Sequence, residues 1–145
     1  MSKFNFNSAV CTNIEQSERL LALGLKKETA DMVHTYLNRW DGYHIHEHDW
    51  SDISCDEQHI PAWSLHRLIE MMPKDVEAEI TLTNGRVRTE WLSFVINNAC
   101  NIIYIDEQQK EFKGFYEGNI YNKVVDAYEW LIKEGYFNKE YLCEK

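Results

Sequence analysis

The chain has 145 residues, enough for one domain and too few to fill two hydrophobic cores. Hydrophobic residues make up 44% of it, sufficient for a core, and its 24 acidic residues outnumber the 15 basic ones to give a formal charge of −9. A field of that sign repels the phosphate backbone, so we expect no nucleic acid ligand and favour a basic protein partner or a cation.

No apolar run is long enough to span a bilayer, and the first residues lack the apolar segment of a secretory signal. We therefore expect a cytoplasmic protein without membrane association. A reducing compartment would keep the scattered cysteines as free thiols; they are Cys11, Cys55, Cys100 and Cys143. No linker or internal repeat interrupts the sequence, which predicts a single globular domain over residues 1–145.

Two short helices are predicted near the N-terminus. Thr12 and Glu15 have the spacing of a capping box, so the first helix should begin at Thr12, and Gly24 is placed to end it. Over residues 28–37 the apolar side chains recur at spacings of one and four, which predicts a second helix. The pair would form a helical hairpin.

The helical pattern disappears over residues 39–58, which are polar, acidic and rich in histidine. We interpret this stretch as a loop or irregular strand on the surface. A third helix is predicted to begin at Pro61, because the first turn of a helix tolerates the missing N–H of proline. Pro73 should end it.

Residues 76–82 show the clearest β pattern, an alternation of apolar and polar side chains that resumes over 86–91. The Asn84-Gly85 pair between them predicts a two-residue type I′ turn, since both of its central positions need a positive φ. Such a turn would place Ala78 opposite Trp91, with the apolar residues of both strands on one face.

Strand character continues at residues 94–96 and 102–105, and a further short strand is predicted at 112–116. An apolar stripe at helical spacing then runs from Tyr121 to Ile132, and Gly135 follows as a stop. We therefore predict an α+β domain. Three N-terminal helices precede an antiparallel sheet of three to four strands, and a long C-terminal helix packs on the sheet.

Three segments of the chain resemble a set of small proteins from gut bacteria of the Bacteroides group, which are often associated with phages or mobile elements. The segments are residues 14–32 (IEQSERLLALGLKKETADM), 60–73 (IPAWSLHRLIEMMP) and 120–142 (IYNKVVDAYEWLIKEGYFNKEYL). Their motifs are mostly core and capping patterns, so the resemblance implies a fold and an accessory role, without an assigned activity.

Histidines supply the densest chemistry in the sequence. In an extended segment the side chains alternate, so three of these imidazoles would share one side and could bind zinc; they are His44, His46 and His48. A fourth ligand could come from Asp49, Cys55 or His59. The run partly resembles the H-x-H-x-D-H run of metallo-hydrolases and departs from it at Glu47-His48-Asp49. The alternative is a solvated loop that binds no metal.

Other catalytic patterns are missing. The sequence has no glycine-rich phosphate-binding motif. Cys55 and His59 could be neighbours only on a helix, which the residues between them do not favour. We therefore favour a protein that is not an enzyme and keep a metal-dependent enzyme as the alternative.

Trp130 lies roughly opposite the apolar stripe of the last helix, near Asp126 and Glu134. Two interpretations follow from this position. Residues 136–142 could fold back and cover the ring, or the ring could be an exposed anchor for a protein partner or for a homo-oligomer, since tryptophan is enriched at binding hot spots.

Three hypotheses for function result. The first is a non-enzymatic accessory protein of phage or mobile-element origin that binds a protein partner. The second is a metal-binding protein or metal-dependent hydrolase that uses the histidines. The third is an acidic mimic of nucleic acid, which requires carboxylates gathered in rows on one surface.

Overall fold

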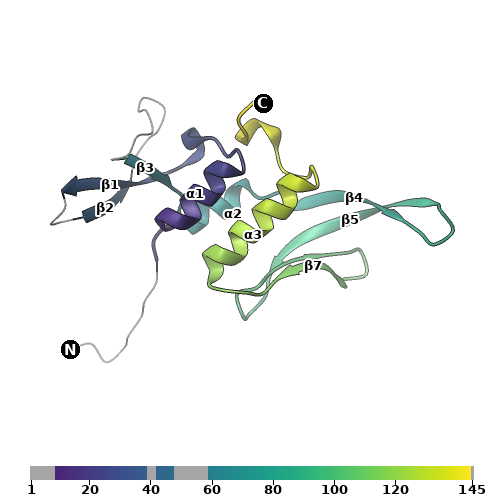
Figure 1. Cartoon of the computed structure of the whole chain (residues 1–145). Coiled ribbons are helices and arrows are strands. Elements are labelled where there is room, and N and C mark those ends of the chain that lie inside the picture. The colour runs from purple at the N-terminus through teal and green to yellow at the C-terminus, as the bar shows by residue number, and fades with distance from the viewer. Residues whose placement is uncertain (1–8, 39–41, 48–58, 145) are drawn as a thin grey trace.

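The computed structural model describes residues 9–38, 42–47 and 59–144, and within these ranges the chain has the predicted α+β fold (Figure 1). The helices are α1 (Ile14–Ala22), α2 (Leu65–Met71) and α3 (Ile120–Lys133). A three-stranded antiparallel sheet has the order β2-β1-β3, made of β1 (Met32–Asn38), β2 (Gly42–Glu47) and β3 (His59–Ala62). A four-stranded antiparallel sheet has the order β4-β5-β6-β7, made of β4 (Asp75–Thr81), β5 (Val87–Ile96), β6 (Ile102–Ile105) and β7 (Glu111–Phe115).

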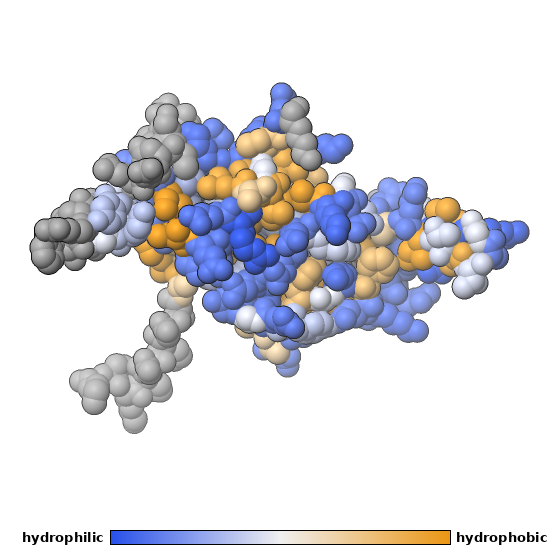
Figure 2. Space-filling view, in the orientation of Figure 1, coloured by the Kyte–Doolittle hydropathy of each residue, from blue (hydrophilic) through white to orange (hydrophobic). Residues whose placement is uncertain are grey.

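The two sheets extend from opposite ends of the helical layer, and α1 and α3 lie side by side between them (Figure 1). On the side drawn in Figure 2, hydrophilic and apolar residues both lie over the helical layer, and apolar residues also gather at the tip of the β4–β5 hairpin. Leu82 and Val87 are exposed at that tip. No helix in the described ranges has the length and apolar character that a bilayer span requires.

Helix α1 begins one residue later than its capping pattern predicted. Asn13 is the N-cap: its Oδ1 accepts from the Gln16 N–H at 2.8 Å, and the Asn13 N–H donates to Gln16 Oε1 at 2.9 Å. Thr12 is buried instead, and its hydroxyl accepts from the Trp63 N–H at 3.1 Å. Gly24 ends the helix as predicted, because its φ of +99° is a left-handed conformation that favours glycine.

The helix predicted over residues 28–37 is wrong, because most of this segment is strand β1. Lys27–Thr29 forms one short 3₁₀ turn, and β1 then becomes the central strand of the small sheet. Val33 and Thr35 are β-branched, and strands on both sides supply backbone partners. A short apolar run does not distinguish helix from strand by periodicity, so these partners decided the outcome.

Helix α2 also begins later than predicted, with Ser64 as its N-cap. The Ser64 hydroxyl accepts from the Arg67 N–H at 3.2 Å and donates to Asp31 Oδ2 at 2.5 Å. Pro61 belongs to the edge strand β3, where proline is tolerated because a strand at a sheet edge lacks one hydrogen-bonding neighbour.

The β4–β5 hairpin forms, but its register differs from the prediction by one residue. The Gly85 N–H donates to Leu82 O at 2.9 Å, and the Leu82 N–H donates to Arg86 O at 2.7 Å. Gly85 has a φ of +82°, so the loop is a type I turn followed by a left-handed glycine, with three residues instead of two. Ala78 therefore pairs with Glu90 and not with Trp91.

This shift places Glu90 in the interior and Trp91 on the opposite face. Glu90 is 4% exposed, while Trp91 is 50% exposed. The Glu90 carboxylate lies 3.2 Å from the Arg88 guanidinium and accepts from the Glu107 N–H at 3.2 Å. These two contacts satisfy a charged group that would otherwise be costly to bury.

Helix α3 packs on the inner face of the four-stranded sheet and against α1 and α2. We define the inner face as the side that carries the buried residues Val76, Ala78, Glu90, Leu92 and Tyr104. Asn119 caps the start of α3, and Gly135 ends it as predicted, with a φ of +79°. Between α1 and α3, Arg19 donates to Asp126 at 3.0 Å and to Glu129 at 3.1 Å.

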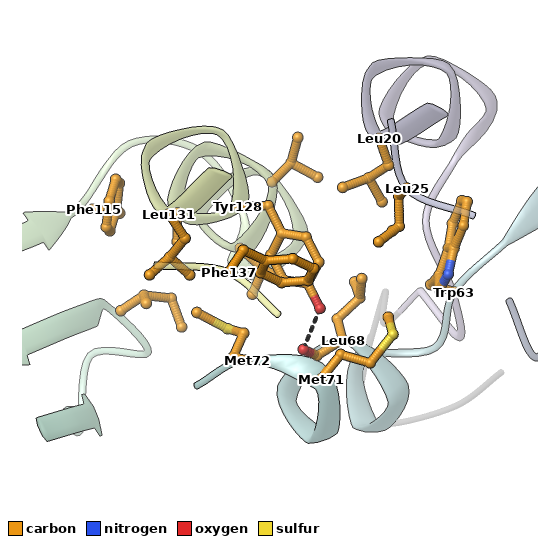
Figure 3. Packing of buried hydrophobic residues seen from close by; sticks show 14 of the residues in the cluster. Leu20, Leu25, Trp63, Leu68, Met71, Met72, Phe115, Tyr128, Leu131 and Phe137 are labelled. Carbon is orange, nitrogen blue, oxygen red and sulfur yellow. Dashed lines mark hydrogen bonds between the residues drawn. The ribbon is translucent and has the colours of Figure 1, made fainter. Parts of the chain in front are cut away.

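Tyr128 of α3 contacts both α2 and the segment that follows α3, at the centre of the core (Figure 3). Its hydroxyl donates to the carbonyl of Leu68 at 2.5 Å, and its ring centroid lies 4.9 Å from that of Phe137. Carbonyls in the last turn of a helix lack intrahelical partners, so this hydroxyl helps to end α2. Burial raises the pKa of Tyr128 well above its ordinary value, which keeps the donor protonated.

We expect Tyr128→Phe to lower the free energy of unfolding by about 1–3 kcal/mol, because the buried Leu68 carbonyl loses its partner. Urea unfolding monitored by circular dichroism measures the change. Tyr136→Phe is the matched control, with an expected effect within about 0.5 kcal/mol, since the half-buried Tyr136 hydroxyl makes no hydrogen bond to the described residues. Equal stability of the two variants would contradict this role of Tyr128.

Candidate functional site

The outer face of the four-stranded sheet, opposite the face on which α3 packs, carries an apolar patch. Cross-strand pairing places Val95 opposite Ile103 and Ser93 opposite Ile105 on this face, and Trp91 lies two residues before Ser93. Val95, Ile103 and Ile105 are half-buried, and Trp91 stands out from them into solvent. Diagonal neighbours on a sheet lie within reach of a large aromatic ring, so these side chains form one continuous surface.

Tyr116 extends the patch across Gly114. Gly114 pairs with Ile103, and a methyl group added at Gly114 would lie 2.6 Å from the Tyr116 ring carbon Cε2. The ring therefore occupies the space that a side chain on β7 would fill. Tyr116 is 49% exposed, so it presents a second aromatic surface to solvent. We use the name apolar patch for Trp91, Val95, Ile103, Ile105 and Tyr116.

Carboxylates border the patch. The outward positions of β4 are held by the row Asp75, Glu77 and Glu79, and Glu77 lies directly opposite Trp91. On the other side, Glu111 pairs with Ile105. Within the described ranges, Glu77, Glu79 and Glu111 form no ion pair. No lysine or arginine occupies an outer-face position on the four strands as described.

Trp130 packs on the inner face and not on an exposed surface. Its ring centroid lies 5.6 Å from that of Tyr104, 6.1 Å from Phe115 and 5.4 Å from Tyr136. Trp130 is half-buried, so the exposed position expected for an anchor is not found. Tyr136 belongs to the C-terminal segment that the alternative interpretation placed over the ring.

The three residues predicted as an interaction site point to different neighbours. Asp126 faces α1 through Arg19, Trp130 faces the sheet, and Glu134 lines a pocket beside β4. The prediction from the apolar stripe assumed that the last helix buries only one of its sides. In the structure α1 and α2 pack against α3, and so does the sheet. The side of α3 that the sequence pattern marks as polar therefore also contacts neighbouring elements.

The histidines predicted as metal ligands are only partly described. His44 and His46 share one side of β2 as expected, and His46 Nε2 lies 2.9 Å from the Thr35 hydroxyl. His59 and His44 both pair with Thr35, on either side of β1, so two strand spacings of about 5 Å each separate them. His48, Asp49 and Cys55 lie outside the described residues. Among the residues that are described, no group of three or more metal-ligating side chains could hold an ion.

Cys11 and His34 form a buried pair that no sequence pattern predicted, because the two residues are far apart in the chain. Cys11 Sγ lies 4.0 Å from His34 Nε2, which is also 2.7 Å from the carbonyl of Thr12. A carbonyl only accepts hydrogen bonds, so Nε2 carries the proton and cannot deprotonate the thiol. Burial, with the charge of Asp31, raises the pKa of Cys11 to about 11. The pair is therefore not an activated nucleophile.

We expect Cys11 to resist alkylation in the folded protein, since roughly one thiol in a thousand is ionised at pH 8 when the pKa is about 11. The other three cysteines are replaced by serine, and the rate of reaction with iodoacetamide is measured by mass spectrometry. The control retains only the exposed Cys100. Cys11 should react at least about ten times more slowly than Cys100 at pH 8 and catch up in urea. Equal rates in the folded protein would contradict this assignment.

Comparisons of the chain with protein-family models, with curated proteins and with solved structures found no match. The resemblance to proteins of the Bacteroides group therefore stays a prediction from the sequence.

Proposed function

We propose that this protein is a small non-enzymatic binding protein that docks a protein partner on the outer face of its four-stranded sheet. Trp91, half in solvent at the edge of the apolar patch, is the observation that carries the proposal. Interface cores are rich in aromatic residues and poor in charge, and their rims are polar. The apolar patch and its bordering carboxylates have this composition.

The hairpin register strengthens the argument. Stability alone favours a buried tryptophan and an exposed glutamate, and the observed register has the reverse, with Glu90 inside and Trp91 outside. Places where local stability rules are broken are expected at functional sites. A role for Trp91 outside the chain's own core supplies a reason for the arrangement.

An accessory role in a phage or mobile element, which the resemblance of three segments implies, suits a protein that acts by binding. The metal-dependent hydrolase gains no support from the described residues, among which no three or more metal-ligating side chains come together to hold an ion. The hypothesis of an acidic mimic gains little support, because the row of carboxylates on β4 borders an apolar surface. A surface that imitates nucleic acid would be charged throughout.

We expect Trp91→Ala to abolish capture of the partner while leaving stability nearly unchanged, because the indole is half exposed and contributes little to the core. Immobilised wild type and variants are incubated with an extract of the source organism, and the retained proteins are identified by mass spectrometry. Val87→Ala is the matched control, since Val87 is 60% exposed on the same face and lies outside the patch.

A protein retained by the wild type and by Val87→Ala but lost from Trp91→Ala would support the proposal. If no protein shows this pattern, docking on the outer face is refuted. Urea unfolding of the three proteins ensures that lost capture does not reflect lost folding.

A further inference from the structure

Resting on the proposed function, we propose that the docked partner is a protein segment that is both amphipathic and cationic. Its apolar side chains would cover the apolar patch, and its lysine or arginine side chains would pair with the carboxylate row of Asp75, Glu77 and Glu79 on β4. The juxtaposition of these two surfaces on one sheet face defines the chemistry of the occupant.

The carboxylates of β4 gather on one side of the strand. Strand side chains alternate, so residues 75, 77 and 79 project from the same side of β4 at intervals of about 7 Å. Glu77 and Glu79 are exposed and form no ion pair within the described ranges. Their negative field lies beside Trp91 with no lysine or arginine at an outward strand position to neutralise it.

A pocket lies at the outer edge of β4, the first strand of the four-stranded sheet. Glu77 and Glu79 also line this open pocket, together with Glu134, Gly135 and Tyr136 from the end of α3. Three carboxylates and one phenol ring around a single opening suit the head group and the aliphatic stem of a lysine or arginine. The two glutamates thus connect the apolar patch to an acidic pocket around the edge of the sheet.

The charge of the carboxylate row disfavours other occupants. A second copy of this chain would bring another formal charge of −9 and a second carboxylate row to the contact. Nucleic acids and anionic membrane surfaces carry the same sign as the row. A cationic partner is attracted by the field, and its approach is accelerated by electrostatic steering.

The test uses fluorescent peptides of about nine residues, long enough to cross the sheet when extended. One peptide alternates leucine and lysine, a second alternates leucine and glutamate, and a third alternates serine and lysine. Binding to the full chain is measured by fluorescence anisotropy. We expect the leucine–lysine peptide to bind most tightly, because only it offers both an apolar side and a cationic side, and its affinity should fall as salt rises from about 0.05 to about 0.5 M.

Matched variants locate the site. Removing both charges in Glu77→Gln/Glu79→Gln should weaken binding of the leucine–lysine peptide about fivefold, and Trp91→Ala should weaken it at least as much. Glu15→Gln/Glu18→Gln is the control, since it removes two charges from exposed positions on α1 and should change the affinity less than about twofold.

Equal losses in the two double variants would show unspecific attraction to an acidic protein and overturn the inference. Tight binding of the leucine–glutamate peptide, or a dimer in solution that blocks the peptide, would overturn it as well. Capture of the natural partner separates the two proposals. If Trp91→Ala loses the partner and Glu77→Gln/Glu79→Gln retains it, docking on the outer face stands and the cationic partner is refuted.

Discussion

Helix α3 is buried on two sides, between α1 and α2 and the inner face of the four-stranded sheet. Val124, Tyr128 and Leu131 are fully buried in the core shared with α1 and α2, while Trp130 packs on rings of the four-stranded sheet. The bond from the Tyr128 hydroxyl to Leu68 fixes α2, which at seven residues is too short to be stable alone. The packing of α3 therefore determines which face of the sheet is interior and which face is left for solvent or a partner.

The turn of the β4–β5 hairpin determines what that free face displays. A turn one residue shorter would shift the pairing and bring Trp91 to the side of Ala78. With Gly85 in its left-handed conformation, the outer face receives an indole beside three half-buried aliphatic side chains. The inner face receives Glu90, which Arg88 and the backbone of Glu107 satisfy. One residue of loop thus converts a core tryptophan into a surface one.

The buried pair of Cys11 and His34 is not an activated nucleophile, and the described residues hold no group of three or more metal-ligating side chains. Cys11 is buried beside His34, whose Nε2–H already donates a hydrogen bond to a carbonyl. Burial raises the pKa of the Cys11 thiol, so it stays protonated. His44 and His59 flank Thr35 on either side of β1, and His46 contacts its hydroxyl. The outer face of the four-stranded sheet differs from this buried pair, because its aromatic rings and carboxylates are open to solvent. This contrast is the physical basis for proposing binding in place of catalysis.

Local patterns in the sequence determined much of the architecture. The apolar stripe of α3, the glycines that end α1 and α3, and the alternation that became β4 and β5 each depend on neighbours a few residues away, so these elements and the α+β class could be predicted. Strand β1 could not be predicted, because its short apolar run suits a helix equally well. Only its pairing with β2 and β3 decides in favour of a strand. The candidate site was missed for a similar reason. Periodicity tells which side chains share a side of an element, but only the packing of distant elements decides which side is covered. Trp130, for which the sequence left both a covered and an exposed position open, packs on rings of the sheet. Trp91, predicted to share a face with Ala78, lies in solvent opposite Glu77.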